Sequence, residues 1–426
     1  MFKSETATKI ASNTIYQIIG KFISMSITMV AVMIVTRAYG REGYGSFSLM
    51  QTFPALFFVI VDFGINAIAA RELSKDWSKA NKYLGNIILI RVLFSLILVL
   101  LINFSLSFFP YSLALKSGIR LGLFLLITQS LFSTANIFFQ VKLKYDYSTI
   151  SYTVGYIAIL ALVLTLSYFK IDIKWVNFSY VVGGAVTFLM CMLFIKKLGI
   201  KPDFSLDKDL WKYLITSALP LGIMFLFSQV SFKQDSLMVS AMKLPASYGL
   251  NNTESVAVYA LAYKIFEVFL VIPTFFMNSA YPVLVRHMVE GKEKLKDTFS
   301  KVIKFLLLSG VFIGVLGIIF SPIAIKILGG EGFSQSVMAL KILCAGLVIF
   351  YLSQPISWLI VTLGYQSRLP FIYFLSAVFN VVTNIIFIPK YSFYASAVIT
   401  ILTELIILIL LILTAQKSWR DKYAKS

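Results

Sequence analysis

Histidine and cysteine are almost absent from this chain of 426 residues, which holds one histidine, His287, and two cysteines, Cys191 and Cys344. Zinc sites need several such ligands at close spacing, and the sequence has no such spacing. A metal centre, a histidine-based catalytic triad and a bound cofactor are therefore not expected. Both cysteines lie in apolar runs, which predicts small buried side chains.

Charged residues are also few, at 13% of the chain, while 59% of the residues are hydrophobic. A soluble domain is about half apolar and about a quarter charged, so this composition indicates a membrane protein. The net charge of +19 would suggest nucleic-acid binding in a soluble protein. Here most cations lie in short loops between apolar runs, where they record membrane orientation. Nucleic acid is therefore not an expected partner.

Twelve apolar runs are 18–29 residues long, and a helix needs about 20 residues to cross a bilayer. Turn residues or charges separate them, as in YGREGYG and RHMVEGKEKLKD. The predicted segments are 14–36, 45–68, 84–105, 119–141, 150–169, 176–195, 214–242, 256–283, 303–328, 340–363, 371–388 and 394–415. The sequence therefore predicts an all-α integral membrane protein with twelve transmembrane helices.

Lysine and arginine concentrate on one side of this arrangement. They are frequent at both ends of the chain and in the loops after even-numbered segments, and sparse in the other loops. The positive-inside rule then predicts that both termini lie in the cytoplasm. The longest loops, 196–213 and 284–302, lie on the same side. A membrane glycan polymerase or ligase is less favoured, because it would need a large external loop.

The longest central loop divides the chain into two halves of six segments each, 1–200 and 201–426. The halves resemble each other weakly, and Asn66 of the first aligns with Asn278 of the second. Two halves of the same orientation form a parallel repeat, which is one of the repeat types found in secondary transporters. The pattern predicts a transporter of two six-helix lobes.

Short motifs in both halves are shared with one family. The first is R-x-x-G-x-x-x-Y-G-x-F-S, formed by Arg37, Gly40, Tyr44, Gly45, Phe47 and Ser48. The second is D-F-G with a following arginine, formed by Asp62, Phe63, Gly64 and Arg71. The second half adds QDSLMV, VAVYALAYKIFEV and YPVLVR. Together they resemble the Wzx-type O-antigen and capsule flippases of the multidrug/oligosaccharidyl-lipid/polysaccharide (MOP) exporter superfamily.

This resemblance covers the whole chain and implies a MATE/MOP-like fold, with two lobes that form a V around a cationic cavity. The implied substrate is a short glycan on undecaprenyl diphosphate, moved from the cytoplasmic to the periplasmic leaflet of the bacterial inner membrane. Alternating access coupled to a proton or sodium gradient would drive transport, and no enzymatic step is implied. A polysaccharide polymerase or chain-length complex is an expected partner.

A drug or cation antiporter of the same superfamily is the alternative. Such antiporters usually carry a key acid in the first helix. Here the first segment carries Lys21 instead, which favours an anionic substrate.

Charges inside the segments are expensive in a bilayer, so they are the main site candidates. Lys233 and Asp235 are two positions apart in the seventh segment and project to different faces, so their partners must come from elsewhere. Lys264 and Glu267 of the eighth segment lie at a similar depth, which predicts a cluster of these four charges. In the first half, matching depth predicts that Asp62 pairs with Lys21 or with Arg91.

Four cations are expected to give the cavity its positive potential and to bind the diphosphate: Lys21, Arg91, Lys233 and Lys264. Three acids are expected to hold these cations or to take up a coupling proton: Asp62, Asp235 and Glu267. Glu404, near the middle of the last segment, is either a cavity acid or a structural one. The alternative is that all these charges form structural ion pairs without substrate contact.

Other candidates lie at segment ends and at breaks. Arg37 flanks the first external turn, as a solvated anchor or as a gate. Arg71 and Arg286 end the second and eighth segments, as positive-inside anchors or as first contacts of the entering diphosphate. Three residues are hinge candidates for a rocking motion: Pro220, Gly222 and Pro273.

Overall fold

The computed structural model describes residues 2–423, with the side chains at 2–14, 220, 221, 224, 228 and 230–232 excepted. The long elements are α1 (Phe2–Asp62), α2 (Ile65–Lys75), α3 (Ala80–Ser105), α4 (Leu113–Gly122), α5 (Leu125–Val141), α6 (Tyr145–Tyr168), α7 (Ile173–Lys197), α8 (Lys208–Ala241), α9 (Asn252–Glu290), α10 (Lys292–Gly329), α11 (Ser334–Ala345), α12 (Leu347–Thr362) and α13 (Leu369–Tyr423). Short 3₁₀ turns are η1 (Trp77–Lys79), η2 (Leu106–Phe108), η3 (Ala246–Tyr248), η4 (Glu331–Phe333) and η5 (Gln366–Arg368). Over residues 2–423 there is no strand, and the predicted all-α class is confirmed.

Nine helical stretches in the part of the chain with described side chains are long and apolar enough to cross a membrane. Two of them, α1 and α13, are each interrupted by a residue with positive φ and so hold two of the predicted segments. The seventh predicted segment lies in α8. All twelve predicted segments lie mainly in helix, although short breaks divide three of them, 45–68, 119–141 and 340–363. The protein is a multi-pass membrane protein.

Two of the interruptions lie where turns are predicted. Gly40 has φ 65° and separates the first two segments, inside the motif YGREGYG. Glycine tolerates this left-handed conformation because it has no Cβ. Ser392 has φ 53° and separates the last two segments.

A third break contradicts the sequence prediction. Segment 45–68 is predicted as one helix, but Phe63 and Gly64 have φ values of 42° and 78°. The chain therefore ends α1 at Asp62 and restarts as α2 at Ile65. The apolar run gives no sign of this break, because hydropathy does not report the sign of the backbone angle φ.

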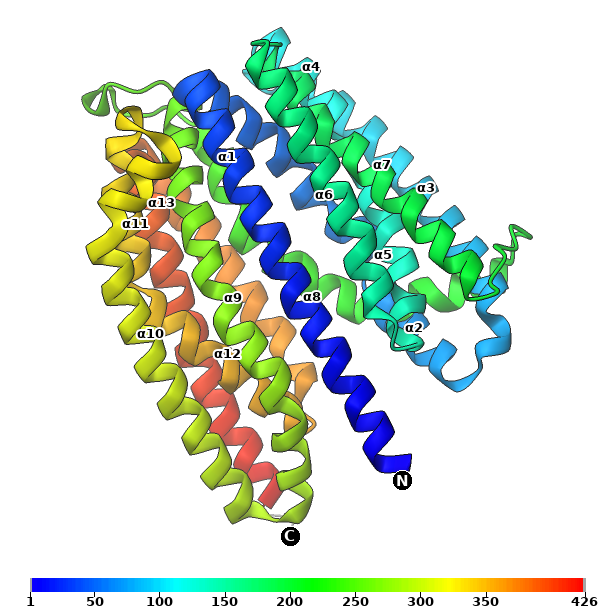
Figure 1. The fold of residues 1–426 in the computed structure, drawn as a ribbon. Coiled ribbons are helices and arrows are strands. Elements are labelled where there is room, and N and C mark those ends of the chain that lie inside the picture. The colour runs from blue at the N-terminus through cyan, green and yellow to red at the C-terminus, as the bar shows by residue number, and fades with distance from the viewer. Residues whose placement is uncertain (1, 424–426) are drawn as a thin grey trace. The chain divides into compact units, whose positions relative to one another are not determined.

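By contact, the chain separates into two compact units, residues 1–226 and 227–426. In the first, α6 packs against α1 and α7, and α5 packs against α2, α3 and α7 (Figure 1). In the second, α9, α10, α11 and α12 pack together, and α13 packs against α12, α11 and α9. The lobe boundary expected at residue 200 stays a prediction.

The core of the first unit lies where α2, α3, α5 and α7 meet the start of α8. The connection before α8 is tied to the beginning of α3. Lys82 forms an ion pair with Asp207, and its hydrogen bond lowers the pKa of that carboxyl below the usual value. The Asn86 side-chain oxygen accepts a hydrogen bond from the Asp207 amide at 3.1 Å. Gly85 lies beneath the backbone of Asp203 in this arrangement.

We expect Gly85→Ala to destabilise the first unit. A Cβ at this position would lie 1.8 Å from the carbonyl oxygen of Asp203, and backbone cannot swing aside as a side chain can. Overpacking of this kind costs about 1–3 kcal/mol, more than alanine gains in helix propensity. Equilibrium unfolding of the purified protein in mixed micelles measures the loss. Gly332→Ala is the control, because a Cβ there meets nothing within 4 Å; equal effects of both variants would contradict the prediction.

Candidate functional site

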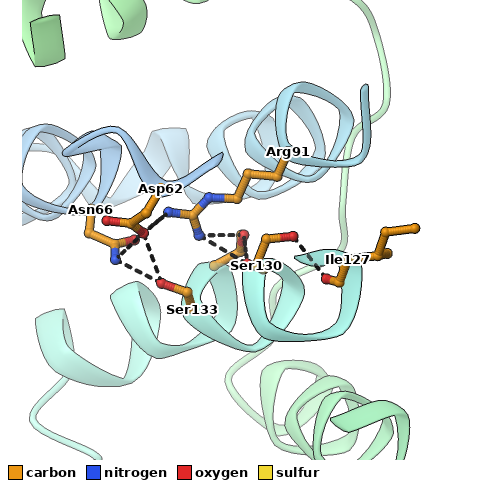
Figure 2. Close-up of polar contacts among 7 residues, drawn as sticks. Asp62, Asn66, Arg91, Ile127, Ser130 and Ser133 are labelled. Carbon is orange, nitrogen blue, oxygen red and sulfur yellow. Dashed lines mark hydrogen bonds and ion pairs between the residues drawn. The ribbon is translucent and has the colours of Figure 1, made fainter. Parts of the chain in front are cut away.

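The break after α1 builds a polar cluster inside the first unit (Figure 2). α1 ends at Asp62 and α2 begins at Ile65, so Asn66 lies in the first turn of α2. Arg91 reaches the pair from α3, and Ser133 reaches it from α5. Three separate stretches of chain thus converge on one guanidinium.

Arg91 is completely buried, with 0% of its surface exposed. Its Nη2 donates hydrogen bonds to Asp62 Oδ1 at 2.6 Å and to Asn66 Oδ1 at 2.8 Å. Its Nη1 donates to the carbonyl oxygen of Ser130 at 3.0 Å and to Thr134 Oγ1 at 2.8 Å. A buried guanidinium needs a counter-ion and several acceptors, and this site supplies both.

The Asp62 carboxylate is fixed equally well. Its Oδ1 accepts from Asn66 Nδ2 at 2.8 Å and from Ser133 Oγ at 3.1 Å, in addition to Arg91. Asn66 Nδ2 also donates to Ser133 Oγ at 2.8 Å. The cluster is therefore a closed network in which each of these side chains orients the next.

The predicted pairing of Asp62 with Arg91 is confirmed by this geometry. The Arg91 guanidinium is enclosed here by protein groups of the first unit, and its expected role as a cavity cation stays a prediction. Its hydrogen bonds connect α3 to Asp62 of α1, to Asn66 of α2 and to the Ser130 turn of α5. Lys21 lies exposed on α1, and its role stays a prediction.

A second charged cluster lies in the second unit and joins α8 to α9. Lys233 Nζ donates to Glu267 Oε1 at 2.6 Å, and Lys264 Nζ donates to Glu267 Oε2 at 3.0 Å. The Lys233 ammonium also lies 5.8 Å from the centre of the Tyr263 ring. The three charged side chains are 29–37% exposed. We call Lys233, Glu267 and Lys264 the lysine triad; its formal net charge is +1.

Asp235 does not join this cluster, which corrects the predicted group of four charges. It is 1% exposed and faces away from the triad, as expected for a residue two positions from Lys233 on a helix. Its Oδ2 accepts from the Tyr259 hydroxyl at 2.8 Å and from Thr400 Oγ1 at 2.9 Å. Its Oδ1 accepts from Asn384 Nδ2 at 3.0 Å. Uncharged donors thus surround this carboxylate.

The polar network continues from Asp235 into α13. Asn384 Nδ2 also donates to Asn380 Oδ1 at 2.9 Å, and Asn380 Nδ2 donates to Thr403 Oγ1 at 3.0 Å. Gln234 of α8 donates to the same Asn380 oxygen. The network therefore links α8 to both halves of α13 through buried amides.

Glu404 is 6% exposed on α13 and accepts a hydrogen bond from the Ser353 hydroxyl of α12. This contact favours neither of its two predicted roles, cavity acid or structural acid. Within the residues with described side chains, no group of three or more histidines, cysteines, aspartates or glutamates could hold a metal ion.

The arginines at helix ends are all solvent-accessible. Arg37 is exposed in α1, three residues before Gly40. Arg71 Nη2 donates to the Tyr213 hydroxyl at 3.1 Å, and Arg286 Nε lies 3.7 Å from a Glu290 carboxylate oxygen. Their gate and entry roles stay predictions.

The hinge roles of Pro220, Gly222 and Pro273 also stay predictions. Gly222 packs against the Phe63 ring, where a Cβ would lie 2.6 Å from a ring carbon, so close packing already accounts for a glycine. Pro273 is buried within α9. The side chain of Pro220 lies outside the described residues.

Residues 10–288 match the model of a family described as polysaccharide biosynthesis proteins. The chain belongs to the polysaccharide biosynthesis protein family. Residues 216–386 also match the MatE family model. No curated protein is significantly similar to the chain in sequence.

Solved transporters share the fold of this family member, and two of the three named here are described as members of the MOP superfamily. An inward-facing multidrug resistance MATE transporter superposes with a TM-score of 0.77 at 12% identity, covering 95% of this chain and 96% of that one. The lipid II flippase MurJ, in an inward closed conformation, gives 0.69 at 16% identity and covers 96% and 90%. A Pyrococcus furiosus transporter described by the reverse polarity of its binding pocket gives 0.67 at 15%, covering 98% and 96%.

The sequence analysis did not identify the uncharged residues that contact Asp235. Asn380 and Asn384 carry no charge, yet both are fully buried and contact the acid network. Their spacing of four residues inside apolar segment 371–388 is the signal that could have revealed them, because it places two amides on one helix face.

Proposed function

We propose that this member of the polysaccharide biosynthesis protein family moves a short glycan on undecaprenyl diphosphate from the cytoplasmic to the periplasmic leaflet of the bacterial inner membrane. The observation that carries the proposal is the lysine triad, in which two ammonium groups share one carboxylate and stay partly exposed. Family membership supports a role in polysaccharide assembly. The excess of lysine and arginine on one side supports cytoplasmic termini.

The triad suits a lipid diphosphate for a simple electrostatic reason. A diphosphate must carry its negative charges through a region of low dielectric, where fixed cations lower the barrier. An ammonium binds phosphate oxygens as a point charge, so a phosphate oxygen can join or replace Glu267 as acceptor. Glu267 holds both lysines in place before the substrate arrives. Lys21 is proposed as a further cation on the substrate path.

Among the acids, Asp235 is the proposed coupling residue. Two of its three donors are hydroxyls, Tyr259 and Thr400, which can reverse and accept a hydrogen bond when the carboxylate takes a proton. The same oxygens are the hard ligands that a sodium ion prefers. Asp62 is less suited, because Arg91 can only donate.

A drug or cation antiporter is the second candidate, and the MatE match over residues 216–386 favours it. The two candidates differ in the sign of the substrate charge. The triad would repel a cationic drug unless the drug bound elsewhere. The polymerase or chain-length partner remains an expectation from the family resemblance.

A flipping assay in reconstituted vesicles tests the proposal with a glycan on undecaprenyl diphosphate. We expect Lys233→Ala and Lys264→Ala to slow transfer by about ten- to a hundredfold, the range for losing one charge-assisted hydrogen bond. Lys301→Ala is the control, because that lysine is 75% exposed in a surface pair with Asp297. Normal transfer by both triad variants would make the triad structural. Transfer of a cationic drug but not of the lipid by the wild type would establish the antiporter.

A further inference from the structure

A hollow of about 880 Å³ lies in the second unit, away from the triad and from Asp235. Faces of α10, α12 and α13 form its walls. On α10 the lining residues Lys292, Lys296, Phe299 and Ile303 are spaced by four, three and four positions, which is one face of a helix. The hollow is therefore built from aligned helix faces rather than from a loop.

Along both α10 and α13 the lining residues change from basic at one end of the hollow to apolar at the other. Along α10 the lining runs from Lys292 and Lys296 to the apolar Ile303, and along α13 it runs from Arg420 and Trp419 back to Ile412. All three cations thus lie toward one end of the hollow, near the start of α10 and the end of α13. The other end is apolar. This order of cation, aromatic ring and aliphatic chain matches the order of layers at a membrane surface.

The charge of the polar end selects an anion. Three cations and one acid, Glu293, line it, which gives a formal charge of +2. Lys292, Lys296 and Arg420 are all exposed, so their head groups are accessible from the surrounding medium. On α12 the lining is apolar and includes the buried Leu359 side chain, which is 5% exposed. A ligand that fits must carry a phosphate or similar anion on an aliphatic chain.

We propose that this hollow is a binding site for an acidic membrane phospholipid. The phosphate of the headgroup contacts Lys292, Lys296 and Arg420, and one acyl chain lies along the apolar end between α10 and α13. Basic residues at a membrane surface attract anionic lipid generally. What distinguishes this place is that cations from two helices border a hollow large enough to take the chain. The inference does not depend on the proposed transport function.

Native mass spectrometry of the delipidated, full-length protein tests the site, with phosphatidylglycerol and phosphatidylcholine as probes. We expect one saturable phosphatidylglycerol site and at least tenfold weaker binding of phosphatidylcholine. The triple variant Lys292→Ala/Lys296→Ala/Arg420→Ala is expected to lose tenfold or more in phosphatidylglycerol affinity. The control Lys304→Ala/Lys417→Ala/Lys422→Ala removes the same charge from the same two helices outside the hollow, and is expected to bind as the wild type does.

A second variant, Ile412→Trp, fills the apolar end without changing charge and is expected to weaken phosphatidylglycerol binding to a similar degree. Thermal unfolding in detergent verifies that each variant is folded. Equal losses in the triple variant and its control would overturn the proposal, because binding would then follow net charge. Displacement of phosphatidylglycerol by equimolar undecaprenyl phosphate would also overturn it, since the hollow would then belong to the substrate lipid.

Discussion

Asp62→Ala is expected to lower the free energy of unfolding by about 3–5 kcal/mol. The substitution leaves Arg91 buried, at 0% exposure, without its counter-ion. It also removes the acceptor that Asn66 and Ser133 share. The desolvation cost of an isolated guanidinium exceeds what the remaining neutral acceptors return. Equilibrium unfolding in mixed micelles, monitored by tryptophan fluorescence, gives the value.

Two further variants separate this effect from a general loss of charge. Asp297→Ala breaks an exposed pair with Lys301 and is expected to cost less than about 1 kcal/mol. The double variant Asp62→Ala/Arg91→Met replaces the buried pair with apolar groups, and we expect it to recover most of the lost stability. If Asp62→Ala unfolded like the surface control, the stability of buried Arg91 would not depend on Asp62 and this prediction would be wrong.

The sequence alone predicted the all-α membrane architecture, and it narrowed the partner of Asp62 to Lys21 or Arg91. Apolar length predicted where the long apolar helices lie, because a membrane-spanning helix needs about 20 mostly apolar residues. Counting residues from the segment ends placed Asp62 and Arg91 at the same depth in the membrane. An unpaired charge at that depth costs free energy, so residues at equal depth are candidate ion-pair partners. Composition and depth in the membrane can both be counted along the chain, so the sequence alone gives them.

The side of each helix that faces the protein interior could not be predicted in the same way. When all faces of a segment are apolar, the helical period no longer marks which face is inside. Lys233 and Asp235 were grouped in one cluster because their depth matched that of Lys264 and Glu267, but they bond to different networks. The break at Phe63 and Gly64 was missed for a related reason, since both residues are compatible with an apolar run.

The weak internal repeat also predicts the order of the helices better than it predicts where polar sites lie. Asn66 and Asn278 align in the two halves, but Asn66 is bonded to Asp62 and Arg91 while Asn278 is exposed on α9. The buried acid of the second unit that bonds to an asparagine, Asp235, lies on α8 instead. Duplicated halves can thus keep the helix order while polar sites diverge, because a site needs only a few substitutions.

Asp235→Asn is expected to uncouple transport from the ion gradient while the protein stays folded. The amide is nearly isosteric, and its oxygen can still accept from Tyr259 and Thr400. It cannot take up a proton, and it binds a cation less strongly than a carboxylate does. We expect gradient-driven accumulation of the lipid-linked glycan to fall by about tenfold or more, the loss for removing one charged interaction.

Passive exchange of the same substrate without a gradient separates coupling from structure. If Asp235 is the coupling acid, exchange by Asp235→Asn stays close to that of the wild type while accumulation is lost. If both fall together, the carboxylate only holds α8 against α13. Glu404→Gln is the matched comparison, because Glu404 is also a buried acid held by a hydroxyl, that of Ser353. Loss of accumulation in that variant alone would move the coupling role from Asp235 to Glu404.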